Sequence, residues 1–244
     1  MYSKMDFDFN TLGRTLIMSF KYQNDERSLQ YIVNLNSLIK DQLKNQLEDS
    51  TITFNSINLY FKEEFEIEKL KIELIYLIET LDLKKSKPSV LWKLPVCIAE
   101  EFTTDIQDYF QGDQSKAMAY IHRFLSLEFR LIFYGFLPGF PYLGGLPNDM
   151  AIPRKDIPSR KTIKGSLAVG ADQVGIYPQD SPGGWNVLGN CPVPMMDFSN
   201  DPPNQINSGD RIQFFQISKE EYLGVLNALE AKITHPYLNF KSYD

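Results

Sequence analysis

The sequence predicts an α+β protein of two domains, because helix-like and strand-like patterns alternate in its first part and short strands with shaped loops dominate the rest. Residues 1–87 contain no proline and only one glycine, Gly13, whereas both residue types are abundant from Pro88 onward. A chain of 244 residues is long enough for two ordinary domains. We therefore expect domains at residues 1–87 and 88–244.

The first domain is expected to have the order βαββαβ. Six segments carry this pattern, namely a strand at 15–20, a helix from 29 to 43, strands at 51–54 and 57–61, a helix from 67 to 81, and a strand at 90–96. This order is the split-βαβ, or ferredoxin-like, arrangement. Ile72 and Ile75 lie off the main apolar stripe of the second helix, so they either pack in the core or form a partner surface.

The second domain is expected to be a small β-barrel or sandwich with two helices. Short apolar runs bounded by turn residues predict strands at 129–134, 166–170, 174–177, 186–188 and 211–215. The helices are expected at 113–125, where Asp113 is placed to cap the first turn, and at 219–232.

Two blocks in this domain, residues 135–145 and 175–186, concentrate glycine, proline and aromatic residues. Ten of the 14 glycines and seven of the 14 prolines lie between residues 134 and 189. Proline removes a backbone donor and fixes φ, whereas glycine permits positive φ and close backbone approach, so both blocks are expected to be shaped loops. Loops of this kind with exposed rings commonly line a site, which makes Phe136, Phe140 and Tyr142 candidate ligand-binding residues.

Several classes of function are disfavoured by composition. The net charge of −6 gives no basic footprint for nucleic acid. The N-terminus lacks the features of a signal peptide and no apolar run approaches ~20 residues, so we expect a cytoplasmic protein without a membrane partner. Two cysteines, Cys97 and Cys191, are too few for a disulfide framework and are expected to be buried thiols.

Familiar catalytic and cofactor motifs are also missing from the sequence. No phosphate-binding loop or Gly-x-Gly-x-x-Gly motif occurs, so any ATP must be bound in another way. The two histidines, His122 and His235, are far apart in sequence and have no cysteine companions, so no metal site is expected. Ser181 precedes Pro-Gly-Gly and departs from the nucleophile elbow Gly-x-Ser-x-Gly.

Polar residues near the two blocks are the remaining candidates. Five cationic residues follow the first block, namely Arg154, Lys155, Arg160, Lys161 and Lys164. They can attract a carboxylate or phosphate, or they can form a solvated basic loop. The candidates in the second block are Tyr177, Gln179, Asp180 and Trp185. The indole of Trp185 offers a flat apolar wall and Asp180 an acceptor or base, although simple loop packing also explains these residues.

The blocks resemble a known family, the B subunit of bacterial 5-oxoprolinase, also called the KipI or allophanate hydrolase subunit 1 family. The resemblance runs in order through Pro95-Val-Cys97, Phe136-Leu-Pro-Gly-Phe-Pro-Tyr-Leu143, Pro153-Arg154, Gly165-Ser166, Gly175-Ile-Tyr-Pro178, Ser181-Pro-Gly-Gly-Trp185 and Gly209-Asp210-Arg211. It implies an N-terminal α/β domain followed by a cyclophilin-like β-barrel.

The resemblance also implies three alternative functions. In the first, the chain joins the C and A subunits in a complex that uses ATP to open 5-oxo-L-proline to L-glutamate. Arg160 and Asp180 are then the expected catalytic residues, with substrate binding by Phe136, Phe140, Tyr142, Arg154, Tyr177, Gln179 and Trp185. In the second, the N-terminal domain inhibits a sensor histidine kinase. The third, a prolyl isomerase, rests on the barrel alone and ranks last.

Overall fold

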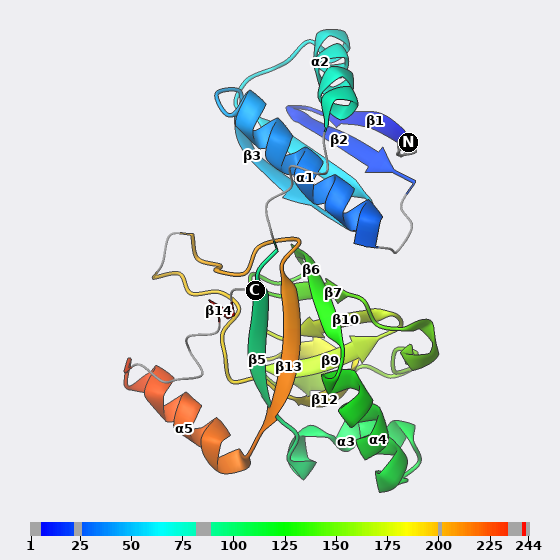
Figure 1. The fold of residues 1–244 in the computed structure, drawn as a ribbon, viewed down its shortest axis with the longest axis vertical. Coiled ribbons are helices and arrows are strands. Elements are labelled where there is room, and N and C mark those ends of the chain that lie inside the picture. The colour runs from blue at the N-terminus through cyan, green and yellow to red at the C-terminus, as the bar shows by residue number, and fades with distance from the viewer. Residues whose placement is uncertain (1–5, 22–25, 82–88, 200–201, 234–240, 243–244) are drawn as a thin grey trace. The chain divides into compact units, whose positions relative to one another are not determined.

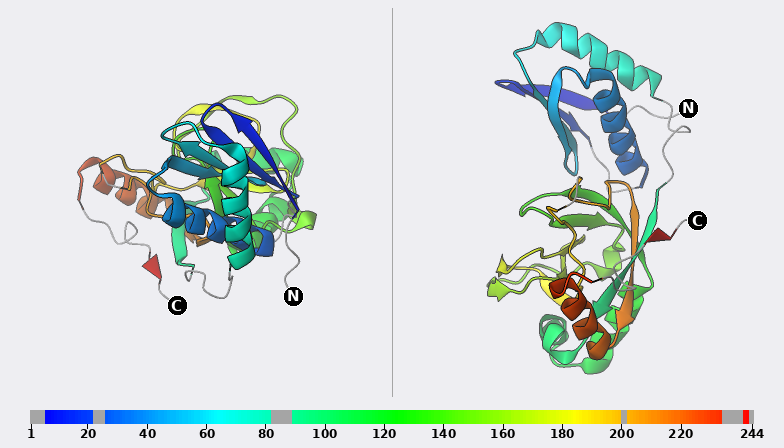
Figure 2. Two further views of the ribbon diagram at one scale, coloured as in Figure 1. Left: turned by 90° about the horizontal axis from the view of Figure 1, so that it is seen from above. Right: turned by 90° about the vertical axis from the view of Figure 1, so that its left-hand side faces the viewer.

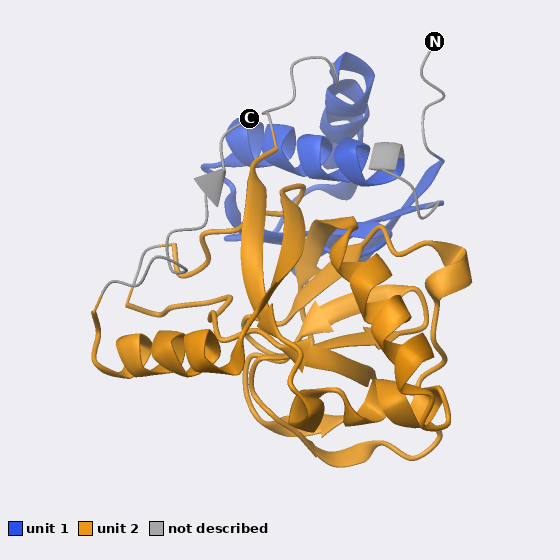
Figure 3. Cartoon of the chain, turned by 60° about the horizontal axis from the view of Figure 1, so that its bottom comes forward, with its two compact units in different colours: residues 1–88 blue, residues 89–244 orange. Residues whose placement is uncertain are grey.

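The computed structural model describes residues 6–21, 26–81, 89–199, 202–233 and 241–242. The chain divides into two compact units, residues 1–88 and 89–244, and each unit has its own hydrophobic core (Figure 3). The expected domain boundary at 87/88 and the side chain of His235 lie outside the described residues.

The first unit is a four-stranded antiparallel sheet covered on one face by two helices (Figures 1 and 2). The elements in chain order are β1 (Phe7–Leu12), β2 (Thr15–Phe20), α1 (Glu26–Leu43), β3 (Leu47–Ile52), β4 (Ser56–Phe61) and α2 (Ile67–Thr80). The core forms because apolar residues alternate along β2, with Leu16, Met18 and Phe20 buried, and recur at helical spacing along α1 and α2.

The expected βαββαβ order is wrong in its last strand. The segment expected as the returning strand of the first unit is β5 (Leu91–Cys97), which pairs with strands of the second unit. The sheet order is β1-β2-β4-β3, so the place beside β2 is filled by β1 through a hairpin with Gly13 at φ +56° in its turn. The predicted hairpin of β3 and β4 is confirmed, and it pairs Ile52 with Ile57.

The second helix of this unit has a second apolar face. Leu70, Leu74, Leu77 and Ile78 are buried on one side of α2. Ile72 is 71% exposed, Ile75 40% and Tyr76 63%. The interpretation of Ile72 and Ile75 as core residues is therefore wrong, and both belong to the surface of the unit.

The second unit is built on a closed seven-stranded barrel, which confirms the expected β-barrel. The strand order is β12-β9-β10-β7-β6-β13-β5, and β12 closes the barrel against β5 where Asn190 lies opposite Cys97. Its strands are β5, β6 (Glu128–Tyr134), β7 (Pro141–Gly144), β9 (Ser166–Gly170), β10 (Gln173–Ile176), β12 (Asn186–Asn190) and β13 (Arg211–Ile217). A short strand β14 (Lys241–Ser242) pairs with Leu91 and Trp92 of β5, on the edge opposite β13.

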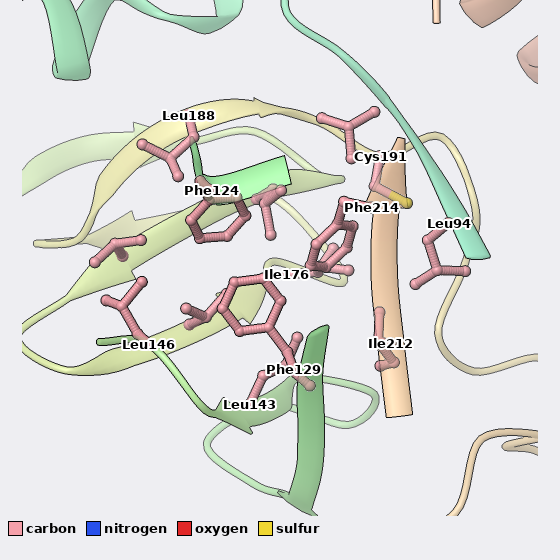
Figure 4. Packing of buried hydrophobic residues seen from close by; sticks show 14 of the residues in the cluster. Leu94, Phe124, Phe129, Leu143, Leu146, Ile176, Leu188, Cys191, Ile212 and Phe214 are labelled. Atoms are coloured by element: carbon pink, nitrogen blue, oxygen red, sulfur yellow. The ribbon is translucent and has the colours of Figure 1, made fainter. Parts of the chain in front are cut away.

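The barrel interior is a continuous apolar core (Figure 4). Leu143, Ile176 and Leu188 point inward from β7, β10 and β12. Helix α4 (Gln114–Leu125) contributes Phe124, which packs on Phe129 with ring centroids 4.6 Å apart. Because successive strand residues face opposite sides, filling the interior leaves the alternate residues of the same strands on the outer face.

The two expected helices of this unit are confirmed as α4 and α5 (Lys219–Glu230), whereas α3 (Thr104–Tyr109) was not predicted from the sequence. The Asp113 side chain accepts a hydrogen bond from Lys116 N and caps α4, as expected. Helix α5 begins with a capping box made by Ser218 and Glu221. Figure 1 shows α3 beside α4, and short 3-10 turns occur at Glu100–Phe102 and Asn148–Met150.

The two blocks are not entirely loops, which corrects the sequence prediction. Pro141–Gly144 of the first block forms β7, and Ser181–Gly183 of the second forms β11, which pairs with β8 (Ser159–Thr162). Proline is tolerated here because Pro141 is the first residue of its strand and β11 and β8 form an isolated two-stranded ribbon.

Candidate functional site

The two blocks lie against each other on the outer face of the barrel. Strands β7 and β10 pair directly, which places Tyr142 opposite Gly175. Gly139, at φ +84°, packs against Pro178, and a Cβ at Gly139 would lie 3.5 Å from the Pro178 side chain. The two blocks therefore form one structural unit.

An aromatic cluster joins the blocks, with Phe140 at its centre. The ring centroid of Phe140 lies 5.0 Å from that of Tyr142, 5.2 Å from Tyr177 and 5.5 Å from Trp185. The contacts to Tyr177 and Trp185 are edge-to-face, with interplanar angles of 84° and 80°. This geometry is favourable because the positive edge of one ring meets the negative face of the other. We call Phe140, Tyr142, Tyr177 and Trp185 the aromatic cluster.

Glycines make room for the aromatic cluster on the sheet. A Cβ at Gly175 would lie 2.6 Å from the Phe140 ring, and a Cβ at Gly170 would lie 2.5 Å from the indole nitrogen of Trp185. Real side chains do not approach so closely, so only glycine at these positions lets the rings lie flat on the strands. The glycine enrichment of this region is explained here by close ring packing as well as by turns.

Phe136 extends the aromatic cluster to the surface. Its ring is 67% exposed and meets Phe140 edge-to-face at 5.7 Å. Its backbone has φ +66°, in the left-handed region that a bulky residue rarely adopts. An exposed aromatic residue held in an unfavourable backbone conformation is more typical of a binding surface than of a folding requirement.

Arg154 provides the positive charge nearest to these rings. Its guanidinium carbon lies 5.6 Å from the centroid of the Trp185 ring, within the range of a cation–π interaction. Arg154 itself is exposed, so its outward N–H groups can bind a ligand carboxylate or a developing oxyanion.

The segment that carries Arg154 is fixed by a half-buried ion pair that sequence reasoning missed. Lys155 Nζ lies 2.8 Å from Asp105 Oδ2, and Val187 N donates to the same oxygen at 3.1 Å. Lys155 N also donates to Gly184 O at 2.7 Å. Asp105 lies on α3, some 50 residues before Lys155, so no local pattern could have identified it. Lys155 is therefore part of the scaffold.

The two tyrosines of the aromatic cluster remain neutral near pH 7. Burial raises the pKa of Tyr142, while the positive charge of Arg154 opposes this effect. Burial also raises the pKa of Tyr177, whose hydroxyl packs closely on Gly183. Neutral phenols can donate a hydrogen bond, which suits the recognition of a carbonyl or carboxylate.

Other predicted site residues lie outside the aromatic cluster. Asp180 is bound to Lys161 Nζ at 2.7 Å and accepts from Lys164 N at 2.8 Å. The Lys161 and Lys164 hydrogen bonds lower the pKa of Asp180, which makes it a weak base that organises its own loop. Arg160 is exposed on β8, and Gln179 is exposed beside Asp180. Tyr177 and Trp185 are only 3% and 6% exposed, so they form the base of the site.

The described residues offer no alternative catalytic centre of the metal-dependent kind. No group of three or more histidine, cysteine or acidic side chains within them is arranged to hold a metal ion. His122 is exposed on the last turn of α4, and both cysteines are buried and free, as expected. No helix in the described part of the chain combines the length and hydrophobicity needed to cross a bilayer.

Comparisons with known proteins agree with this architecture. A family model described as the carboxyltransferase domain, subdomain C and D, matches residues 9–206. A protein named as the 5-oxoprolinase B subunit, from Bacillus subtilis (strain 168), is 33% identical over 130 residues, covering 53% of this chain and 54% of that protein. A protein of the same name from Escherichia coli O157:H7 is 37% identical over 103 residues, covering 42% and 46%. The chain thus spans about half the length of the curated relatives it matches.

Solved structures show the same fold within much larger proteins. The urea amidolyase of K. lactis matches with a TM-score of 0.69 at 14% identity, over 98% of this chain and 16% of that one. The Kluyveromyces lactis urea carboxylase matches with a TM-score of 0.68 at 14% identity, over 97% and 24%. The resemblance inferred from the sequence motifs is confirmed, and the chain belongs to the carboxyltransferase subdomain C and D family that includes the 5-oxoprolinase B subunits.

Proposed function

We propose that the chain is a non-autonomous subunit of an ATP-dependent 5-oxoprolinase, which opens 5-oxo-L-proline to L-glutamate together with the C and A subunits. The observation that carries the proposal is the exposed guanidinium of Arg154 above an aromatic surface assembled from both blocks. A small flat lactam with one carboxylate matches an apolar wall next to a single cation. The shared name of three relatives supports the same substrate.

The reaction needs activation because a five-membered amide is stable. Transfer of the γ-phosphoryl group of ATP to the amide oxygen releases ADP and gives the ring carbon a good leaving group. Water then adds to that carbon, and the C–N bond breaks as the nitrogen is protonated, which leaves an acyl phosphate. A second water hydrolyses the acyl phosphate to glutamate and phosphate. Addition of the first water moves the C=N electron pair onto nitrogen, whereas addition of the second water to the acyl phosphate carbonyl develops negative charge on oxygen, and a fixed cation stabilises that transition state.

The residues of this chain are assigned to binding and charge stabilisation. Arg154 holds the substrate carboxylate or the developing oxyanion, while Phe136 and Tyr142 contact the ring. Arg160, exposed on the ribbon next to β11, remains a predicted second cation for the phosphoryl group. Asp180 remains a predicted catalytic residue only if Lys161 moves away, because the ion pair holds its carboxylate.

ATP is assigned to a partner subunit. Phosphate groups bind well at helix N-termini that carry free N–H groups and no competing negative charge. Among the described helix starts, α4 is capped by Asp113, and the first turn of α5 carries Glu220 and Glu221. The first turn of α2 carries Glu68. The acidic side chains at these helix N-termini disfavour binding of a nucleotide phosphate there, so we expect the nucleotide to be bound by the C or the A subunit.

Co-expression with the genomic neighbours tests the proposal. Purified complex should form glutamate from 5-oxoproline and hydrolyse ATP in a 5-oxoproline-dependent manner, and the isolated chain should show negligible turnover. Omitting this chain should remove the activity. Full activity of the remaining subunits without it, or robust turnover by the chain alone, would exclude the proposed role.

A second candidate, inhibition of a sensor histidine kinase, is favoured by one observation. Ile72, Ile75 and Tyr76 form an exposed apolar strip on α2 of the first unit. If this strip binds a kinase, the full chain should reduce kinase autophosphorylation and Ile72→Glu should abolish the effect. Under the oxoprolinase proposal, the chain leaves autophosphorylation unchanged.

A further inference from the structure

A large cavity in the second unit adjoins the aromatic cluster through Tyr177 and is not lined by Arg154 or Trp185. It has a volume of about 700 Å³ and lies between α5, the segment 191–198 and the loop that follows β10. Apolar walls come from Ile176 on the barrel side and from Leu226 and Leu229 on α5. This volume falls within the range of pockets that hold small molecules.

The described lining of this cavity carries positive charge only. Among its described lining residues, Lys164 is the only charged one, and the hydroxyl and amide side chains are those of Tyr177, Gln179, Asn190 and Tyr222. Lys164 is exposed, and its ammonium makes no salt bridge within the described part of the chain. The nearest named carboxylate, Asp180, is bound instead to Lys161 at 2.7 Å. The cavity thus combines an apolar interior with one available cation.

The backbone of Lys164 is held in place by two hydrogen bonds. Lys164 N donates to Asp180 Oδ1 at 2.8 Å, and Lys164 O accepts from Asn190 Nδ2 at 2.8 Å. Asn190 Oδ1 in turn accepts from the Tyr222 hydroxyl at 3.0 Å, which links the loop to α5. The polar wall is therefore internally satisfied, so binding a ligand does not require these hydrogen bonds to break.

The opposite wall can adapt to a ligand. Met195 and Met196 line this cavity and also a second, smaller cavity of about 200 Å³ beside Trp92. Met195 is buried in the core and Met196 is half-buried, and unbranched methionine side chains fit varied apolar shapes.

We propose that this cavity binds a small amphipathic monoanion, a carboxylate with an aliphatic or flat apolar body. The apolar part lies between α5 and the segment 191–198, and the carboxylate is bound by Lys164. Tyr177 and Gln179 line this cavity and also belong to the proposed substrate site, whereas Arg154, Tyr142 and Trp185 do not line it, and binding of the monoanion is measured without 5-oxoproline turnover.

Fluorescence of 8-anilinonaphthalene-1-sulfonate with the full chain tests this inference. The probe should bind one saturable site and should be displaced by decanoate at lower concentrations than by 1-decanol, which lacks the charge. Lys164→Gln should weaken decanoate binding about tenfold, since a hydrogen bond to a charged group is lost. Lys93→Gln, the control at an exposed lysine on β5, should leave decanoate binding within twofold because Lys93 does not line the cavity.

Leu226→Trp adds bulk to the cavity wall from a partly exposed helix position and should abolish probe binding. Urea unfolding establishes that each variant is folded, and the comparison of Lys164→Gln with Lys93→Gln decides the question even if Leu226→Trp is unstable. Absence of saturable binding, equal displacement by decanoate and 1-decanol, or equal decanoate affinity of the two lysine variants would overturn the inference.

Discussion

Replacing Gly170 by alanine tests whether Trp185 is packed as the structure shows. A Cβ at position 170 would lie 2.5 Å from the indole Nε1 and 2.6 Å from Cγ. Carbon contacts normally lie near 3.5–4.0 Å, so the ring would have to retreat by about 1 Å. Trp185 is only 6% exposed and is held by Phe140, so this retreat disturbs the whole aromatic cluster. Overpacking of this kind costs about 1–3 kcal/mol of unfolding free energy.

Urea denaturation at pH 7 gives this free energy, and Gly184→Ala provides the matched control. A Cβ at Gly184 meets its nearest neighbour, Lys155 O, only at 3.8 Å, and its φ is not positive. We therefore expect Gly184→Ala to be neutral or to stabilise the protein by about 0.4–1 kcal/mol. If Gly170→Ala unfolds at the same urea concentration as the unmodified protein, Trp185 does not pack against Gly170 and the described base of the site is incorrect.

Three further predictions rest on the same contacts. Phe136→Gly should leave the free energy of unfolding unchanged or raise it by about 1 kcal/mol, because the left-handed φ is no longer strained. The same change should reduce 5-oxoproline turnover by the complex. A lower free energy of unfolding with unchanged turnover would mean that Phe136 serves folding and not substrate binding. Ion pairing lowers the pKa of Asp180, so its stabilising contribution is present above about pH 4 and is lost as pH falls through the lowered pKa. Urea titrations should therefore show Asp180→Asn less stable than the unmodified protein at pH 7 but equal to it at about pH 2, and a pH-independent difference would exclude the ion pair as its cause. Brief proteolysis should cut between residues 81 and 89 and leave two folded fragments, since each unit has its own core; the absence of a fragment beginning there would argue against two domains.

The elements that could be predicted from sequence are those specified by local patterns. Helix α4 begins where Asp113 predicts it, and the β3–β4 hairpin follows from two alternating runs around Asn55 and Ser56. The concentration of glycine and proline in the two blocks coincides with the aromatic cluster, because close ring packing and sharp turns need those residue types locally.

The elements that could not be predicted depend on partners distant in sequence. Strand β5 has a clear strand pattern, but the pattern cannot tell which sheet it joins, and it pairs with β13 about 120 residues later. The role of Asp105 depends on Lys155 and Val187, which reach it only through the fold. The catalytic role of Asp180 stays a prediction, and the sequence could not show that Lys161 holds its carboxylate in an ion pair.

The central claim is that Arg154 and the aromatic cluster bind 5-oxoproline within the assembled complex. Its most direct test is the ratio of kcat/KM for 5-oxoproline between complexes that carry Arg154→Gln and Arg123→Gln. The second substitution removes the same charge from an exposed arginine that pairs with Asp149 on the surface. A cation that stabilises developing charge contributes about 2–4 kcal/mol, so the Arg154 variant should be slower by a factor on the order of 100. Equal kcat/KM values for the two complexes, with both variants folded, would contradict the assignment of this surface as the substrate site.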